Sequence, residues 1–257
     1  MIRIGTSGFS YPDWVGTVYP AGLPAWEQLA FYAREFSTVE INMTYYRVPD
    51  KRTVEGWIRR TPDDFLFSVK AFQGLTHERD APDFPGFVAA VRPLVEAKRL
   101  ACVLAQFPYS FHPEPTNREY LARLRDGLRD LPVVIEFRDA GWVHEDTFAL
   151  LRRLNLGFCS VDEPRLPGLM PPVAVATGPV AYVRFHGRNA AKWYDHKEAW
   201  QRYDYTYSVD ELREWVPKLR QLDRAAPLTL VYFNNHRGGQ AVRAARDLGQ
   251  LLLLPEN

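Results

Sequence analysis

The sequence predicts a parallel (β/α)₈ TIM barrel that occupies residues 1–257 as a single domain. Three observations predict it: eight short apolar runs recur along the chain, amphipathic segments separate them, and 257 residues is a typical length for this fold. The runs are rich in β-branched or aromatic residues and end in polar or turn residues. The alternative is an open doubly wound sheet, but no G-x-G-x-x-G turn follows the first run.

The pattern places strands and helices in regular alternation. The expected strands are 2–6, 38–42, 65–70, 101–107, 133–138, 157–162, 180–186 and 228–234. The expected helices are 25–36, 53–60, 84–98, 117–130, 145–154, 209–223 and 240–254. Ser208 and either Thr116 or Asn117 are candidate N-caps. Segment 163–179 contains five prolines, so we expect a loop there and an irregular or missing sixth helix.

Composition excludes several classes of protein. The chain is 46% apolar and 25% charged, with a net charge of +1. These values exclude a disordered chain and a protein that coats nucleic acid by bulk positive charge. No apolar run is long enough to span a membrane. Cys102 and Cys159 lie in apolar runs, as buried reduced thiols do, so we expect a cytoplasmic protein without a membrane partner.

Alternate residues of each strand point to opposite faces, and only one set is wholly apolar. The other set becomes polar toward the end of every strand, so we expect it to point into the barrel. Its polar members include Glu40, Asn42, Lys70, Gln106, Glu136, Arg138, Asp162, Arg184, His186, Asn234 and His236. Barrel active sites lie at these strand ends, which favours a functional site. The alternative is a self-satisfied layer of ion pairs between the glutamates and the arginines, and for Glu136 with Arg184 both interpretations remain open.

Two kinds of catalytic chemistry are candidates at these strand ends. Glu40 and Glu136 could act as an acid and a base, and Glu136 could also act with His186 or His236. His77, His186 and His236 could approach a metal together with Glu136 and Asp162. However, no H-x-H pair is present and several cations share the same mouth. We therefore predict no metal and no cofactor.

Cations and aromatic rings indicate an anionic ligand with flat faces. The expected ligand-binding residues are Asn42, Tyr46, Lys70, Gln106, Arg138, Asp162, Arg184, Arg188, Trp193, Asn234 and Asn235. Lys70 could alternatively form a Schiff base, although anion binding is favoured. Gly238 and Gly239 open the last helix and form either a phosphate site or a plain turn. We expect Trp14, Trp142 and Trp200 to pack within the loops.

Seven segments resemble a bacterial family of unknown function, the YecE-like family. They are GTSGFSYPDW (5–14), VEINMTYYRVP (39–49), FSVKAFQGLTH (67–77), LAQFPYSF (104–111), VIEFRDAGW (134–142), YVRFHGRN (182–189) and YFNNHRGGQAVRAA (232–245). The resemblance covers nearly the whole chain. It implies a TIM barrel distantly similar to barrel endonucleases and sugar isomerases, and it implies no settled activity.

The strand-end residues support three functional hypotheses. The first is a protein that binds a phosphate-bearing ligand, such as a nucleic-acid strand, a nucleotide or a sugar phosphate, and that acts as a metal-independent hydrolase if it is an enzyme. The second is a glycosidase or sugar isomerase that uses Glu40 and Glu136. The third is a binding protein without catalysis.

Overall fold

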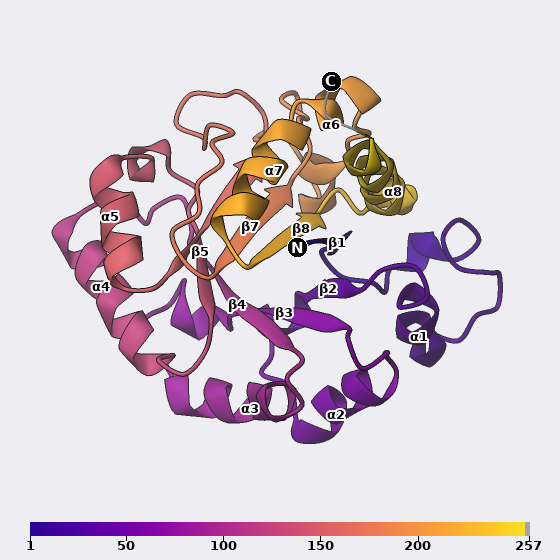
Figure 1. Ribbon diagram of the computed structural model, residues 1–257, viewed down its shortest axis with the longest axis horizontal. Helices are drawn as coiled ribbons and strands as arrows, with labels where there is room; N and C mark the ends of the chain where they lie inside the picture. Colours follow the sequence, from indigo (N-terminus) through magenta and orange to yellow (C-terminus); the bar gives the residue numbers. More distant parts are fainter. Residues whose placement is uncertain (255–257) are drawn as a thin grey trace.

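In a computed structural model, which describes residues 1–254, eight parallel strands form one sheet that curls into a nearly closed barrel (Figure 1). The strands are β1 (Ile2–Thr6), β2 (Thr38–Ile41), β3 (Leu66–Lys70), β4 (Leu100–Gln106), β5 (Val133–Glu136), β6 (Gly157–Asp162), β7 (Val180–Phe185) and β8 (Leu228–Phe233). They are hydrogen-bonded in the order β1-β8-β7-β6-β5-β4-β3-β2. The predicted fold is confirmed.

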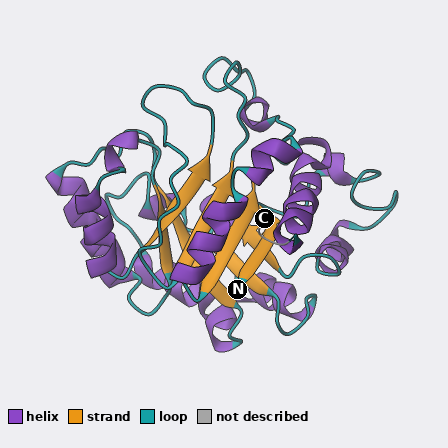
Figure 2. Cartoon of the chain, turned by 45° about the horizontal axis from the view of Figure 1, so that its top comes forward, coloured by secondary structure: helices purple, strands orange, loops and turns teal. Residues whose placement is uncertain are grey.

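The helices lie outside the strands (Figure 2). They are α1 (Gln28–Tyr32), α2 (Lys51–Arg59), α3 (Phe84–Glu96), α4 (Pro115–Gly127), α5 (Glu145–Arg153), α6 (Val209–Arg213), α7 (Val216–Ala225) and α8 (Gln240–Leu253). No helix occurs between β6 and β7, as the prolines predicted. The proline rings of this segment fix φ and remove N–H donors that a helix would need.

Three helix predictions need correction. The segment expected as a helix over 25–36 is a 3₁₀ turn at Ala25–Glu27 followed by the short helix α1. The segment expected as one helix over 209–223 is two helices, because Pro217 in the first turn of α7 lacks an N–H and a helix restarts there. Helix α4 begins earlier than predicted, at Pro115, so its N-cap is Glu114 rather than Thr116 or Asn117. The predicted Ser208 cap is confirmed by a reciprocal capping box with Glu211.

A tyrosine closes the seam between the first and last strands of the sheet order. The Tyr32 hydroxyl accepts from the Thr6 N–H at 2.9 Å and donates to the Thr38 carbonyl at 3.1 Å, so it bridges β1 and β2. A Cβ at Gly5 would meet the Thr38 oxygen at 2.4 Å, so only glycine permits this approach. Above it, Gly8 N donates to the Glu40 carbonyl at 2.8 Å.

The strand register determines which side chains point into the barrel, because residues paired across parallel strands face the same side. The predicted inward set pairs accordingly: Glu40 with Ser68, Gln106 with Glu136, and Arg184 with Tyr232. All six side chains are buried. The predicted polar interior is therefore present on these strands.

Strand β6 is the exception, and the predicted orientation of Asp162 is wrong. The register pairs Cys159 with Tyr182 and Asp162 with Phe185, so Cys159 points inward and Asp162 points toward the helices. Every residue of β6 is buried. Alternation identifies the inner face only where the two faces differ in polarity, and in this strand they do not.

Both cysteines are free and buried, as predicted. The Cys102 Sγ lies 3.5 Å from the Ser68 hydroxyl inside the barrel. Within residues 1–254, none of the helices combines the length and the apolar character needed to cross a membrane.

Replacing Tyr32 with phenylalanine should destabilise the protein by about 1–3 kcal/mol, because the buried Thr6 N–H loses its acceptor. Urea unfolding measures this cost. Tyr194→Phe is the matched control, since Tyr194 is 65% exposed, and it should change stability by less than about 0.5 kcal/mol. Equal midpoints for the two variants would contradict the role of Tyr32 in closing the barrel.

Candidate functional site

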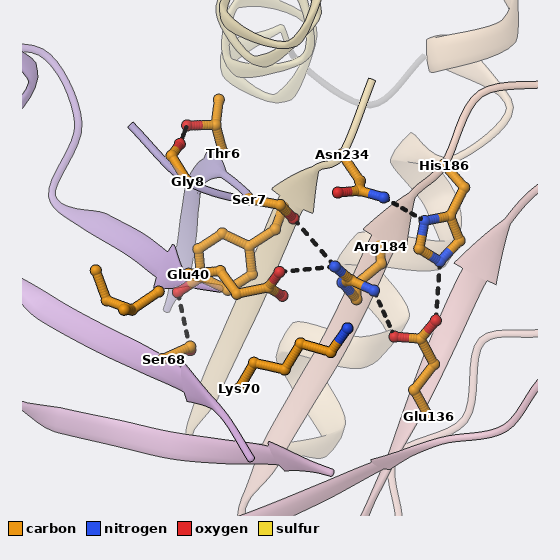
Figure 3. A network of polar contacts seen from close by, with 12 residues as sticks. Thr6, Ser7, Gly8, Glu40, Ser68, Lys70, Glu136, Arg184, His186 and Asn234 are labelled. Atoms are coloured by element: carbon orange, nitrogen blue, oxygen red, sulfur yellow. Dashed lines mark hydrogen bonds and ion pairs between the residues drawn. The ribbon is translucent and has the colours of Figure 1, made fainter. Parts of the chain in front are cut away.

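A buried arginine at the centre of the barrel joins two glutamates from opposite strands (Figure 3). Arg184 on β7 donates to Glu40 Oε1 on β2 at 2.7 Å and to Glu136 Oε2 on β5 at 2.6 Å. The other Glu40 oxygen accepts from the Tyr182 hydroxyl at 2.7 Å. Arg184 is only 2% exposed and both glutamates are 0% exposed. Charges this deep are tolerated because they are paired and hydrogen-bonded.

Glu136 also holds a neutral histidine in place. His186 Nε2 lies 2.9 Å from Glu136 Oε1, and its Nδ1 lies 3.2 Å from Asn234 Nδ2 (Figure 3). The amide must donate to Nδ1, so Nε2 carries the proton and donates to the carboxylate. Burial and the charge of Arg138 lower the pKa of His186 to about 3. Its imidazole is therefore neutral near pH 7.

The second arginine of the site completes the pairing of Glu136. Arg138 Nη2 lies 2.9 Å from Glu136 Oε1. Burial acts to raise the pKa of Glu136, but the guanidiniums of Arg138 and Arg184 outweigh it and hold this pKa well below its usual value. Glu136 is thus an ionised, fully engaged carboxylate rather than a proton donor. The interpretation as an ion-pair layer holds for Glu40 and Glu136.

Above this layer lies a cavity of about 460 Å³ at the carboxyl ends of the strands. Its charged lining residues are Lys70, Arg138 and Arg184, and no aspartate or glutamate of residues 1–254 contributes to it. Asn42, Gln106, Asn234 and His236 add polar groups. Phe9, Tyr11, Tyr45, Tyr46, Trp200 and Tyr203 add aromatic rings. Eight of the predicted site residues meet here: Asn42, Tyr46, Lys70, Gln106, Arg138, Arg184, Asn234 and His236.

Lys70 differs from the other two cations of the cavity because no carboxylate pairs with it. Its side chain points toward Arg184 and Glu136 (Figure 3), yet none of the ion pairs within residues 1–254 includes its Nζ. Lys70 instead makes a cation–π contact with Tyr45, whose ring centroid lies 4.4 Å from Nζ. Burial and the Arg184 charge lower the pKa of Lys70 to about 8.

Several polar atoms at the cavity have no partner within the part of the chain that the structure describes. They are Asn42 Oδ1, Arg138 Nε and His236 Nδ1. The His236 ring stacks on Tyr11 with centroids 4.2 Å apart, and burial lowers its pKa. Buried polar atoms normally have a hydrogen-bond partner, so these three are exceptions among the cavity-lining residues.

The long loop after β7 reaches over the cavity, but not with the predicted tryptophan. Trp193 is 2% exposed and packs inside the loop, with the Arg202 guanidinium 5.3 Å from its ring centroid. Trp200, which we expected to pack within the loop, lines the cavity and stacks under Arg237 at 4.1 Å. The roles of the two rings are exchanged. Trp14 and Trp142 are buried as predicted.

Three further residues predicted to bind the ligand, Asp162, Arg188 and Asn235, lie outside the cavity lining. Arg188 donates to Asp162 at 2.9 and 2.8 Å and to Glu214 at 2.8 Å, so this pair anchors the loop after β7 on the outer side of the sheet. Asn235 is fully buried and donates to the Tyr205 carbonyl at 2.8 Å. Arg188, Asp162 and Asn235 therefore bind other groups of the protein, and not a ligand as we expected.

The glycine pair before α8 forms a turn whose donors are already used. Gly238 N donates to the Asp13 carboxylate at 2.7 Å, and Gly239 N donates to the His236 carbonyl at 3.2 Å. A phosphate would have to displace Asp13. Of the two alternatives for these glycines, the structure favours the plain turn.

Among residues 1–254, no three His, Cys, Asp or Glu side chains form a group able to hold a metal ion. His77, one of the histidines considered as a ligand, lies with its ring centroid 5.1 Å from that of Tyr45. Burial and the charge of Lys70 lower the pKa of His77 to about 4.

One titratable residue near the strand ends was not predicted from the sequence. Glu163 is 3% exposed and accepts from Met170 N at 2.9 Å, while its other oxygen lies 3.5 Å from Arg138 Nη1. Burial, opposed by Arg138, raises the pKa of Glu163 to about 7. The only signal in the sequence was a second carboxylate directly after Asp162. Tyr182, whose hydroxyl donates to Glu40, was not predicted as a site residue either.

A family model matches this chain from end to end. The family described as "Protein of unknown function DUF72" matches residues 3–257. The chain belongs to the DUF72 family. The UPF0759 protein YunF of Bacillus subtilis is 33% identical over 270 residues, which covers 98% of this DUF72 chain and 95% of YunF. The UPF0759 protein YecE of Escherichia coli is 31% identical over 144 residues, 54% of this chain and 44% of YecE. The predicted resemblance is confirmed.

Solved structures of DUF72 proteins have the same fold. The Thermotoga maritima protein TM1631 superposes with a TM-score of 0.91 and is 40% identical, covering 98% of this chain and 99% of that one. The Enterococcus faecalis protein EF0366 gives a TM-score of 0.88 at 28% identity, covering 100% and 97% of the two chains. Both are similar to this chain over their full length.

In this DUF72 protein, Arg184→Met should cost about 3–5 kcal/mol, because two buried carboxylates lose their shared partner. Adding Glu40→Gln and Glu136→Gln should recover part of the loss. The free energy of unfolding in urea measures both effects. Arg152→Met, which breaks a surface pair with Glu145, should cost less than about 1 kcal/mol. A similar cost for Arg152 and Arg184, or no recovery in the triple variant, would contradict the network.

Acid should destabilise the protein through His186. Its pKa is about 3 in the folded protein, whereas an unperturbed histidine, as in the unfolded chain, has a pKa of 6.5. The unfolded chain therefore binds the extra proton between these values, and stability present above pH 6.5 is lost as the pH falls, by up to about 1.4 kcal/mol per pH unit. Urea unfolding between pH 4 and 7 should show this slope, and His186→Gln should reduce it. An unchanged slope in the variant would contradict the neutral buried imidazole.

Proposed function

We propose that the cavity binds a small ligand that carries a phosphate group and a flat ring, of the size of a mononucleotide or a sugar phosphate. The observation that carries this proposal is the charge of the cavity: three cations line it, and no described carboxylate does. The family comparison leaves the ligand open, so the proposal rests on the geometry of the site.

The charge balance supports an anion. Arg184 forms an ion pair with Glu40, and Arg138 forms one with Glu136. Lys70 has no carboxylate partner among the described residues. Bringing an anion next to Lys70 would neutralise a half-buried charge that has no ion-pair partner among residues 1–254. Arg138 and Arg184 line the same cavity, and a guanidinium suits the planar, multiple contacts of phosphate oxygens.

The aromatic lining supports a ring. Tyr46 is 75% exposed at the rim, and Trp200 faces the cavity from the loop after β7. Asn42 and Asn234 supply amide groups that can recognise ring substituents or hydroxyls. A volume of about 460 Å³ falls in the range of small-molecule sites, and it favours a single nucleotide-sized ligand over a long nucleic-acid strand.

The rival hypotheses receive less support. A glycosidase needs one carboxyl group that donates a proton and another that attacks or activates water. Glu40 and Glu136 share Arg184, their remaining oxygens contact Tyr182 and His186, and neither lines the cavity. The same engagement argues against hydrolysis with Glu136 as the base. Binding of the anion is the part of the first hypothesis that the geometry favours.

Binding of pyridoxine 5′-phosphate, a probe with one ring and one phosphate, tests the proposal by calorimetry. Lys70→Met should weaken binding at least tenfold, about 1.4 kcal/mol, because the unpaired cation is lost. Affinity in the parent protein should be greatest below pH 8 and fall as the pH rises through about 8, where the Lys70 ammonium loses its proton. Lys51→Met, at an exposed lysine of α2, should leave affinity unchanged.

Pyridoxine, which lacks the phosphate, should bind far more weakly than its phosphate ester. Equal affinity for the two compounds would show that the phosphate is not recognised. Undiminished binding to Lys70→Met would remove Lys70 from the site.

A further inference from the structure

We propose that Lys70 reacts covalently with its ligand, forming an imine with the carbonyl carbon of a phosphate-bearing aldehyde or ketone held in the cavity. This inference rests on the proposed function for the recognition of the phosphate. It adds a reaction type and narrows the ligand class to small carbonyl compounds.

The geometry around Lys70 is what a nucleophilic amine requires. The residue ends β3, its side chain points into the barrel mouth, and it lines the cavity (Figure 3). No described carboxylate forms an ion pair with the ammonium, so no salt bridge has to break when Lys70 loses the proton and gains a reactive lone pair. The Tyr45 ring on one side leaves the cavity side open to a ligand.

The neighbouring charges favour the neutral amine. Arg184 and Arg138 share the cavity with Lys70 and are held protonated by their own carboxylates. Burial together with these cations lowers the Lys70 pKa to about 8. A lysine that is desolvated beside another cation is a recognised form of activated amine. The other five lysines of the chain lie outside the cavity lining.

Different side chains of the cavity would bind the phosphate and react with the carbonyl group. The guanidiniums of Arg138 and Arg184 line the cavity and can attract the phosphate, while Lys70 approaches the carbonyl end of the same ligand. Holding the two reactants in one cavity replaces a bimolecular encounter with an intramolecular one. The ligand must therefore be short enough to place a phosphate and a carbonyl within one cavity of about 460 Å³.

The step balances without any further reactant. The lone pair of the neutral Nζ forms a C–N bond as the π pair of the carbonyl moves to oxygen. The oxygen then takes up both amine protons, the C–O bond breaks, and one water molecule leaves. Lysine amine and carbonyl compound thus give an imine and water, with no change of oxidation state.

Trapping with pyridoxal 5′-phosphate tests this reaction in the full-length protein. Sodium cyanoborohydride supplies hydride to an imine carbon, so the adduct becomes permanent and peptide mass spectrometry locates it. We expect at least tenfold faster labelling at Lys70 than at Lys51, Lys192 or Lys197, with a rate that rises with pH and levels off above about pH 8. Pyridoxal without phosphate should label Lys70 at least tenfold more slowly.

Lys70→Arg separates the two proposals, because it keeps a cation but removes the nucleophile. This variant should retain binding of pyridoxine 5′-phosphate and lose the fast labelling. If the parent binds pyridoxine 5′-phosphate but labels Lys70 no faster than the surface lysines, imine formation is wrong and anion binding stands. If Lys70 is labelled equally fast by pyridoxal and its phosphate, the lysine is reactive but the phosphate site is wrong. Failure of both binding and labelling overturns both.

Discussion

The Arg184 guanidinium is the group on which the barrel interior depends. It joins strands β2 and β7 through Glu40 and strands β5 and β7 through Glu136, across a space that most barrels fill with branched apolar side chains. A buried ion pair of this kind contributes little net stability compared with apolar packing, but removing one member leaves uncompensated charge. Glu136, which Arg184 pairs, in turn contacts Arg138 and His186, and His186 contacts Asn234.

Periodicity predicted the fold well, because most of the strands separate an apolar outer face from an inner face that becomes polar toward the end of the strand. The failure at β6 has a physical cause. Asp162 is polar but is satisfied on the outer face by Arg188 and Trp215, while Cys159 on the inner face is apolar in character. A one-residue error in assigning faces reverses every side chain of a strand, and only the register corrects it. The bridge that the Tyr32 hydroxyl forms between β1 and β2 was also not predicted, because the residues around Tyr32 in the sequence do not indicate its partners.

The site was predictable to the extent that it lies on strands. Lys70, Gln106 and Arg184 were located by alternation and all line the cavity. Residues far into the long loop after β7 were not located correctly, because a loop has no periodicity to relate sequence to direction. Trp193 and Trp200 lie in the same loop and have the same chemistry, yet one is buried and the other faces the cavity.

The unpaired lysine is the strongest indication that the mouth has a function beyond stability. A chain that neutralises Arg184 with Glu40 and Glu136 could have neutralised Lys70 in the same way, or replaced it by an apolar residue. Burial and the Arg184 charge lower the pKa of Lys70 to about 8, so the surroundings of this amine disfavour its charged form. The ion pairs of Arg184 do not use this amine, whereas both proposals for the cavity do. Under the proposed function, the unpaired Lys70 and the excess of cations around the cavity have one explanation, which is that a bound anion supplies the missing negative charge.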